Sequence, residues 1–137
     1  MRPLPVVLAA LLCVPALALA TPLRCADPCV VGTSNAGYSP PVVEVASGGS
    51  VVWRSTGGGH IQSDVGQAPE CFVTFVASGG TSGPARFDVR GGALWANTTE
   101  LGDVACLNAQ RLPTGGFVLP YECTIHPSMR GAIVVQG

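Results

Sequence analysis

Short apolar runs alternate with turn-forming residues along most of the 137-residue chain, and no long stretch repeats its apolar positions at helical spacing. The runs are rich in β-branched and aromatic side chains and are separated by Gly, Ser and Pro, which is typical of strands joined by tight turns. The predicted strands are Val42–Val45, Ser50–Arg54, Cys71–Val76, Arg86–Val89, Gly116–Cys123 and Ala132–Val135. Short strands at this spacing predict an all-β sandwich or small barrel.

Two stretches have a less regular pattern. Residues 93–108 carry a weak helical pattern that is compatible with one short helix. Residues 21–37 are expected to form an irregular segment that is tied down by Cys25 and Cys29. The chain has no internal repeat and no low-complexity tail.

The N-terminus has the features of an export signal. Arg2 precedes an apolar run from Val6 to Leu19, and the run ends in the small-x-small sequence Ala18-Leu19-Ala20. This pattern predicts a signal peptide over residues 1–20 and a single mature domain over residues 21–137. A retained N-terminal anchor is the alternative. Export would place the protein in the periplasm or outside the cell.

The charge balance argues against two classes of partner. The chain has a formal net charge of −1, with seven Arg or Lys against eight Asp or Glu. Such a balance offers no basic surface for nucleic acid or for an anionic membrane. After Leu19 no apolar stretch is long enough to span a membrane as a helix, so no membrane span is expected after signal cleavage.

The cysteine count is odd once the predicted signal is removed. Of six Cys in the chain, Cys13 lies in the signal, which leaves Cys25, Cys29, Cys71, Cys106 and Cys123. In an exported protein four of them can form two disulfides, and the fifth needs another role. We assign that other role to Cys123 because of the residues that follow it.

A thiol, an imidazole and a thioether lie on one short segment at the spacing C-x2-H-x2-M, namely Cys123, His126 and Met129. Two His and one Cys with a weak axial Met form the type I copper sites of electron-transfer proteins. The chain contains two His in total, so His60 is the candidate for the fourth position. Taken singly, a core Met, a surface His or a half-disulfide would be the more ordinary interpretation.

Other chemistries fit these residues less well. Structural zinc needs four Cys or His ligands, and catalytic zinc needs an open water position with an acid or base nearby. The chain lacks the C-x-x-C-H motif of covalent haem and the C-x-x-C motif of thioredoxin-like redox proteins. A Cys–His hydrolase built from Cys123 and His126 alone would lack a third group to orient the base.

The segment Tyr121–Val135 resembles the copper-binding loop of the cupredoxins, and its two-residue spacing between His126 and Met129 is similar to the short loop of the amicyanin type. Upstream, the strand–turn–strand pattern of Val42–Trp53 is also similar to the family, and His60 follows it where the first ligand should fall. The resemblance implies a single-domain, cupredoxin-like Greek-key β-sandwich. It also implies one Cu(I)/Cu(II) ion held by His60, Cys123, His126 and Met129.

The resemblance further implies a monomeric, non-enzymatic carrier that moves single electrons between redox protein partners. In such proteins the second His lies within an apolar patch, which here would include Ile125 and Pro127. Two features depart from the family. Ile61 stands where the family usually has Asn after the first His, so that Gln62 or Ser63 would have to take its supporting role. The long span from His60 to Cys123 is expected to hold an insertion around residues 66–110.

In addition to the resemblance, we interpret that insertion as closed by a Cys71–Cys106 disulfide, with Cys25–Cys29 as the second bridge. Four cysteines allow three pairings in all. A copper chaperone or storage module without an electron-transfer role would use the same ligands and is the alternative function. A structural domain that has lost its copper is a third possibility, against which the retention of all four ligands argues. Asn97-Thr98-Thr99 is a glycosylation sequon that matters only in a glycosylating organism.

Overall fold

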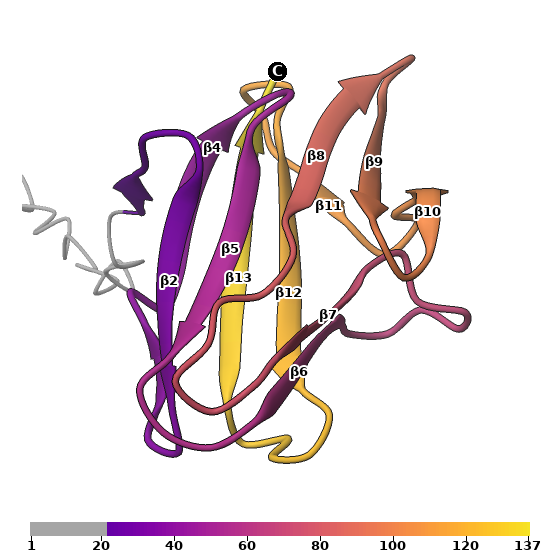
Figure 1. The fold of residues 1–137 in the computed structure, drawn as a ribbon. Helices are drawn as coiled ribbons and strands as arrows, with labels where there is room; N and C mark the ends of the chain where they lie inside the picture. The colour runs from indigo at the N-terminus through magenta and orange to yellow at the C-terminus, as the bar shows by residue number, and fades with distance from the viewer. Residues whose placement is uncertain (1–21) are drawn as a thin grey trace, which may run out of the picture.

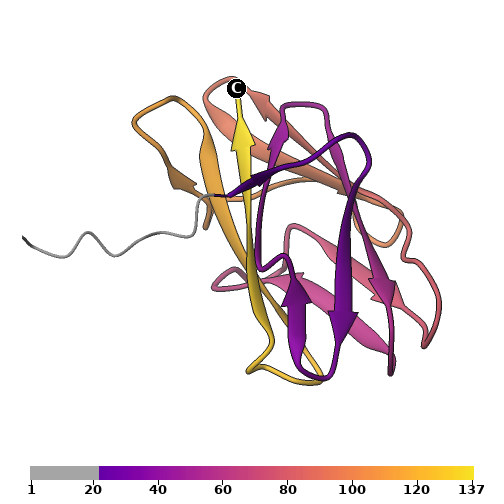
Figure 2. The ribbon, with the colours of Figure 1, turned by 90° about the vertical axis from the view of Figure 1, so that its left-hand side faces the viewer.

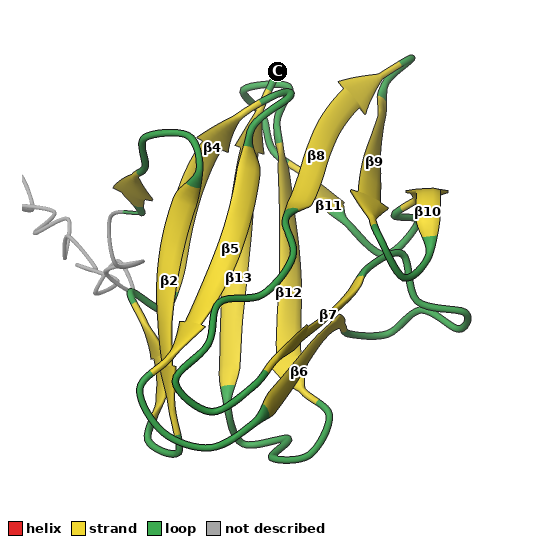
Figure 3. Ribbon diagram, viewed as in Figure 1, coloured by secondary structure: helices red, strands yellow, loops and turns green. Residues whose placement is uncertain are grey.

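A computed structural model describes residues 22–137, and the predicted signal peptide lies outside the described residues. The described chain consists of strands and connecting loops (Figure 3). No helix long and apolar enough to cross a membrane occurs among residues 22–137. The expected all-β sandwich is therefore confirmed.

The strands form two mixed sheets (Figure 1). The first has the order β1-β4-β13-β12-β6-β7, with β11 paired to the start of β12. Its strands are β1 (Leu23–Arg24), β4 (Val42–Ala46), β6 (His60–Asp64), β7 (Val73–Val76), β11 (Gln110–Arg111), β12 (Phe117–Cys123) and β13 (Arg130–Gln136). The second has the order β10-β9-β8-β5-β2-β3. Its strands are β2 (Cys29–Ser34), β3 (Gly37–Ser39), β5 (Ser50–Ser55), β8 (Ala85–Arg90), β9 (Ala93–Thr98) and β10 (Gly102–Ala105).

The core lies between the sheets and is built by strict alternation of side chains. Along β12 every second residue is buried, from Phe117 to Cys123, and β5 buries Val51, Trp53 and Ser55 in the same way. Successive side chains of a strand point to opposite faces, so this period of two places one face of each strand inside. The Trp53 ring stacks on Phe72 at 5.8 Å between centroids and meets Tyr121 edge-on at 5.4 Å. This aromatic cluster joins the two sheets.

Two expectations for the less regular stretches are wrong. Residues 93–98 form β9, not a helix, and Leu94, Ala96 and Thr98 are buried while their neighbours are more exposed. β9 pairs with β8 on one side and with β10 on the other, and its buried residues alternate as they do in a strand. The segment after Cys25 is likewise ordered as β2, which pairs in parallel with β5. Burial of Cys29, Val31 and Thr33 against the core overrides the weak local pattern.

The segment 66–110 that was expected to be an insertion contains β7, β8, β9 and β10. It contributes to both sheets, since β7 pairs with β6 and β8 pairs with β5. A disulfide joins Cys71 to Cys106 near the two ends of this segment, and another joins Cys25 to Cys29. Cys123 is the free cysteine of the described chain. The Cys71–Cys106 disulfide therefore links the loop before β7 to the loop after β10.

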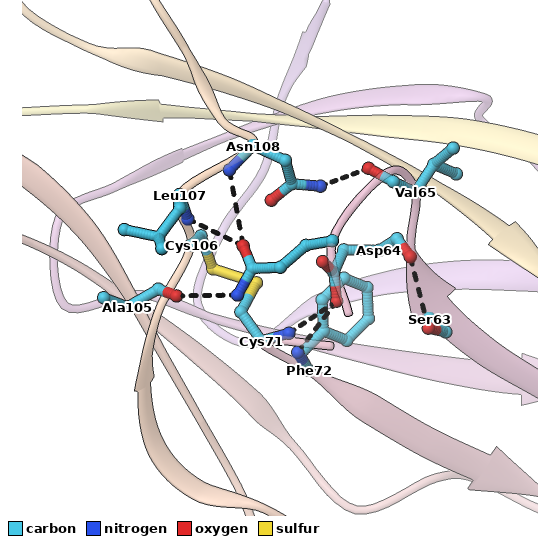
Figure 4. The surroundings of a disulfide bond; sticks show 10 residues. Ser63, Asp64, Val65, Cys71, Phe72, Ala105, Cys106, Leu107 and Asn108 are labelled. Atoms are coloured by element: carbon cyan, nitrogen blue, oxygen red, sulfur yellow. Dashed lines mark hydrogen bonds between the residues drawn. A yellow bond between two sulfur atoms is a disulfide. The ribbon is translucent and has the colours of Figure 1, made fainter. Parts of the chain in front are cut away.

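A buried polar cluster surrounds the Cys71–Cys106 disulfide (Figure 4). One carboxylate oxygen of Asp64 accepts hydrogen bonds from the backbone N–H groups of Cys71 at 2.8 Å and Phe72 at 3.1 Å. Its other oxygen is buried without a partner among the described residues, and so is the side-chain oxygen of Asn108. Burial raises the pKa of Asp64, although the Phe72 and Cys71 bonds oppose that shift.

Replacement of Asp64 by Asn should change how stability depends on pH. Because the pKa of Asp64 is raised on folding, its contribution is fully present below its unfolded pKa of about 3.9 and is lost as pH rises through the folded value. The unfolding free energy of Asp64→Asn, relative to the native protein, should therefore increase with pH above about 4. Urea unfolding at a series of pH values measures this difference.

Asp103 provides a control of opposite sign. Arg90 donates a hydrogen bond to this exposed carboxylate at 2.6 Å and lowers its pKa. The unfolding free energy of Asp103→Asn, relative to the native protein, should therefore decline across the pH range in which Asp103 loses its proton. An Asp64→Asn difference that stays constant with pH would contradict the prediction.

Candidate metal centre

Antiparallel pairing of β6 with β12 brings His60 and Cys123 together. The start of β6 lies beside the end of β12, with Gln62 opposite Cys123 and Asp64 opposite Tyr121. His60 is the first residue of β6 and Cys123 is the last of β12. Both side chains point into the core and are fully buried. The site therefore lies at the end of the sandwich opposite the C-terminus, at the bottom of Figures 1 and 2.

The loop that joins β12 to β13 supplies the next residues and is closed by backbone hydrogen bonds. The N–H of Cys123 donates to the carbonyl of Met129 at 3.0 Å, and the N–H of Met129 donates to the carbonyl of His126 at 2.8 Å. Residues 124–128 are exposed, whereas Met129 is buried again. The loop thus places the His126 ring at the surface, next to the buried side chains of His60 and Cys123.

The three expected strong ligands converge. One ligand atom from each of His60, Cys123 and His126 lies within 4.8 Å of the other two. The Cys123 sulfur is 3.8 Å from Nδ1 of His60, and the two imidazole rings are 5.8 Å apart between centroids. Nε2 of His60 lies 2.8 Å from the carbonyl oxygen of Gly57. A carbonyl only accepts, so Nε2 carries the proton and Nδ1 offers its lone pair toward the sulfur.

The chemistry of this donor set fits a copper ion. One sulfur and two imidazole nitrogens are soft to intermediate ligands, which suit copper and do not suit magnesium or calcium. Three convergent strong donors with a thioether nearby match the trigonal arrangement of type I copper. Met129, the expected axial ligand, is buried at the end of the same loop. The set is consistent with one copper ion per chain.

At Ile61, where the resemblance led us to expect an Asn, the two ligand segments are joined by a backbone hydrogen bond. The N–H of Thr124 donates to the carbonyl of Ile61 at 2.9 Å, which joins the two ligand segments without a side chain. Gln62 is fully buried opposite Cys123, and its side-chain oxygen accepts from the Thr74 hydroxyl at 3.0 Å. The Gln62 Nε2 has no partner among the described residues. Ser63 is buried and bonds to the carbonyl of Asp64, away from the ligands.

Two tyrosines lie behind the site and stay uncharged. Tyr121 and Tyr38 pack together at 4.7 Å between ring centroids, and the Tyr121 hydroxyl accepts a hydrogen bond from the Trp53 indole at 3.2 Å. Burial raises the pKa of both phenols well above the ordinary value. They therefore form a neutral, packed pair of rings in the core.

Two exposed apolar residues flank His126 in the loop, and the exposed Arg130 donates to the carbonyl of Pro127 at 3.3 Å. Ile125 is 53% exposed, and Pro127 is also exposed. Phe75, which the sequence interpretation did not select, is 54% exposed and lies opposite Ile61 in the register of β6 and β7. The alternation in β7 could have revealed it, because Thr74 and Val76 are buried while the large aromatic residue between them points outward.

Gly131 is expected to tolerate no side chain. It lies opposite Tyr121 in the β12–β13 pair, and a Cβ atom there would lie 2.5–2.7 Å from the end of the Tyr121 ring. The ring cannot move freely because Trp53, Phe72 and Tyr38 surround it. Gly131→Ala should lower the unfolding free energy by about 1–3 kcal/mol, as overpacked cores do. Chemical denaturation measures the loss.

The matched control is Gly57→Ala, since a Cβ atom at Gly57 would meet nothing within 4 Å. This variant should stay within about 0.5 kcal/mol of the native protein apart from loop entropy. Equal destabilisation by the two substitutions would show that Tyr121 does not restrict position 131.

Comparison with known proteins identifies the fold. Neither a protein-family model nor a curated protein sequence matches the chain. Among solved structures, a reduced amicyanin variant aligns over 78% of this chain and 80% of its own, with 20% identity and a TM-score of 0.50. A Cu(I) form of another amicyanin variant aligns over 81% and 85%, with 20% identity and a TM-score of 0.52.

A copper-containing nitrite reductase from Thermus scotoductus is also similar. It aligns over 80% of this chain but only 22% of its own length, with 22% identity and a TM-score of 0.52. This chain therefore corresponds to one part of that larger enzyme. The arrangement of two mixed sheets agrees with these likenesses. The chain has a cupredoxin-like fold, similar to that of amicyanin.

Proposed function

We propose that this protein is an exported type I copper protein that carries single electrons between redox partners. The observation that carries the proposal is the convergence of one atom each from His60, Cys123 and His126 within 4.8 Å, with His60 and Cys123 buried and His126 exposed. His60 Nδ1, the Cys123 sulfur and one His126 nitrogen would be the strong ligands. Met129 would be the weak axial ligand. A bound copper ion would supply a one-electron Cu(I)/Cu(II) couple.

The chain's own residues would keep the site rigid during electron transfer. His60 and Cys123 are fixed at the ends of paired strands, and the loop to Met129 is closed by two backbone hydrogen bonds. Ligands that hold one geometry in both oxidation states leave little rearrangement for each electron transferred. The similarity to amicyanin variants that have been solved in reduced and oxidised states supports the proposal of an electron carrier.

His126 is the route that we propose for the electron. Its ring lies 5.8 Å from that of buried His60 and is exposed among Ile125 and Pro127. An apolar surface can approach a partner closely without losing strong hydration, and small redox interfaces of this kind dissociate quickly. The similarity to amicyanin over 80% of that chain supports a carrier function without catalysis of its own.

The test combines spectroscopy with electrochemistry. Addition of Cu(II) to the purified protein should produce an intense blue band that saturates at one copper per chain. The copper protein should then show a fast, reversible one-electron wave at an electrode. A colourless or merely pale complex would refute the type I assignment.

A copper chaperone or storage module is the second candidate. The observation that favours it is the exposure of the whole loop from Thr124 to Ser128, through which an acceptor could reach the metal. Such a protein should transfer its copper quickly to an added acceptor, whereas a carrier should retain copper through many cycles of reduction and oxidation. Copper loss to a competing chelator during repeated cycling therefore distinguishes the two.

A further inference from the structure

The turn that precedes His60 contains three consecutive glycines, Gly57, Gly58 and Gly59, and it connects β5 to β6. The carbonyl of Gly57 accepts the hydrogen bond from Nε2 of His60 at 2.8 Å. This bond determines which nitrogen of His60 faces the Cys123 sulfur. The conformation of the turn therefore decides where the lone pair of Nδ1 points.

Ser55, the last residue of β5, holds the turn from inside. Its hydroxyl donates to the carbonyl of Gly58 at 2.5 Å and accepts from the N–H of Gly57 at 3.2 Å. These two bonds fix the peptide groups on both sides of the one that contains the Gly57 carbonyl. Ser55 itself is only 3% exposed and is anchored because its N–H donates to the carbonyl of Gly80 at 2.9 Å.

Ser78 holds the same peptide group from outside. Its hydroxyl accepts from the N–H of Gly58 at 3.2 Å, and this N–H shares one peptide plane with the Gly57 carbonyl. Hydrogen bonds at the two ends of one peptide group strengthen each other. The hydrogen bonds from Ser78 through the Gly57–Gly58 peptide group to His60 are therefore aligned for a strong bond to the imidazole.

Glycine is required at the centre of the turn. Gly58 has a φ of +75°, and a Cβ atom there would lie 3.1 Å from the Asn35 side chain and 3.5 Å from Nε2 of His60. The positive φ and the close approach to Asn35 therefore disfavour any side chain at Gly58, whereas the approach to Nε2 is ordinary van der Waals contact. A bare glycine turn loses much conformational entropy on folding, so it needs the bonds from Ser55 to keep one conformation.

We propose that Ser55 is a positioning residue for His60, acting through the Gly57–Gly58 turn that fixes the Nε2-protonated form of the imidazole. The inference rests on the proposed function, because it concerns how the first ligand is presented to the metal. It explains how this chain orients His60 although Ile61 stands where a side-chain amide would otherwise support the site.

Ser55→Ala and Ser82→Ala form a matched pair for the test. Ser82 is 7% exposed, and its hydroxyl accepts from Trp53 N–H at 3.0 Å and donates to the carbonyl of Gly83 at 2.8 Å. Both substitutions thus remove a buried hydroxyl that makes two backbone hydrogen bonds. Only Ser55 contacts the turn that bonds His60.

The first measurement uses the metal-free protein and follows the His60 Nε2–H proton by NMR. In the native protein this proton should be visible and protected from exchange with water. Ser55→Ala should accelerate its exchange about tenfold, the effect of one lost net hydrogen bond, while Ser82→Ala leaves it unchanged. Equal exchange in the two variants, or an unprotected proton in the native protein, would overturn the proposal.

The second measurement is copper binding. Loss of a group that orients a ligand typically weakens metal affinity about 10–100-fold, so Ser55→Ala should bind Cu(II) correspondingly more weakly than Ser82→Ala. If Ser55→Ala does not fold, Ser78→Ala at the exposed end of the same peptide group decides the matter by the exchange measurement. Unchanged exchange in that variant would overturn the proposal.

The two proposals fail in different ways. A native protein that develops no blue band would refute the type I function, while the exchange of the His60 proton in the metal-free protein would still test the role of Ser55.

Discussion

Replacement of Cys123 by Ala should abolish the intense visible band of the copper-loaded protein. That band requires a thiolate bound to Cu(II), and Cys123 is the free cysteine of the described chain. The cysteine is fully buried beside His60, with its sulfur 3.8 Å from Nδ1. The variant would keep two imidazoles, and any copper it binds should give only the weak colour of nitrogen and oxygen ligands. Absorption spectroscopy during Cu(II) titration measures the change.

Met129→Leu is the matched control on the same loop. An axial thioether bonds copper weakly, so this variant should keep the intense band while its reduction potential changes. Leu also preserves the buried volume at position 129 to a good approximation, since exchanges of Leu and Met are usually tolerated. Persistence of the band in Cys123→Ala, or its complete loss in Met129→Leu, would contradict the ligand assignment.

Removal of the Cys71–Cys106 disulfide should produce the largest loss of stability. The two cysteines are 35 residues apart in sequence, and a disulfide that closes a loop of this length stabilises by about 4 kcal/mol in the chain-entropy model. Both half-cystines are also buried, so replacement by Ala leaves some cavity. Urea unfolding of the Cys71→Ala, Cys106→Ala double variant measures the loss.

The Cys25–Cys29 disulfide provides an internal comparison because its cysteines are only four residues apart. The same model gives about 2 kcal/mol for such a short loop, so its double Ala variant should lose roughly half as much. The copper spectrum should survive removal of the Cys71–Cys106 disulfide. The Cys71 N–H donates a hydrogen bond to Asp64, which lies at the end of β6 away from His60. Equal losses in the two double variants would show that loop length does not determine the effect.

The strands that were predicted from sequence are those in which local pattern and tertiary burial agree. Val42–Val45 and Ser50–Arg54 lie within β4 and β5, where β-branched residues alternate with exposed ones. β6 was not predicted, because His60, Gln62, Ser63 and Asp64 are polar and yet buried. Their polar groups are accommodated by partners elsewhere, such as Thr74 for Gln62 and the backbone of Cys71 for Asp64. Hydrophobic periodicity contains no information about such partners.

Residue types and their spacing were sufficient to select the candidate donors of the metal centre. Cys123, His126 and Met129 lie within seven consecutive residues, so their proximity follows from chain connectivity alone. His60 could be named because the chain has only two His, but its distance from Cys123 could not be derived. Antiparallel pairing of β6 with β12 brought these two residues to 3.8 Å, and pairing across the sheet depends on contacts between residues far apart in sequence.

The support of the site and its exposure to solvent depend on tertiary contacts. The proton on Nε2 of His60 follows from the Gly57 carbonyl, and the shape of that turn follows from Ser55 and Ser78. Exposure of Phe75 near the site depends on the register of β6 with β7. Residue types and spacing select the donors because metal chemistry is local. Orientation, burial and access need the packed sandwich, since they arise from segments that only folding brings together.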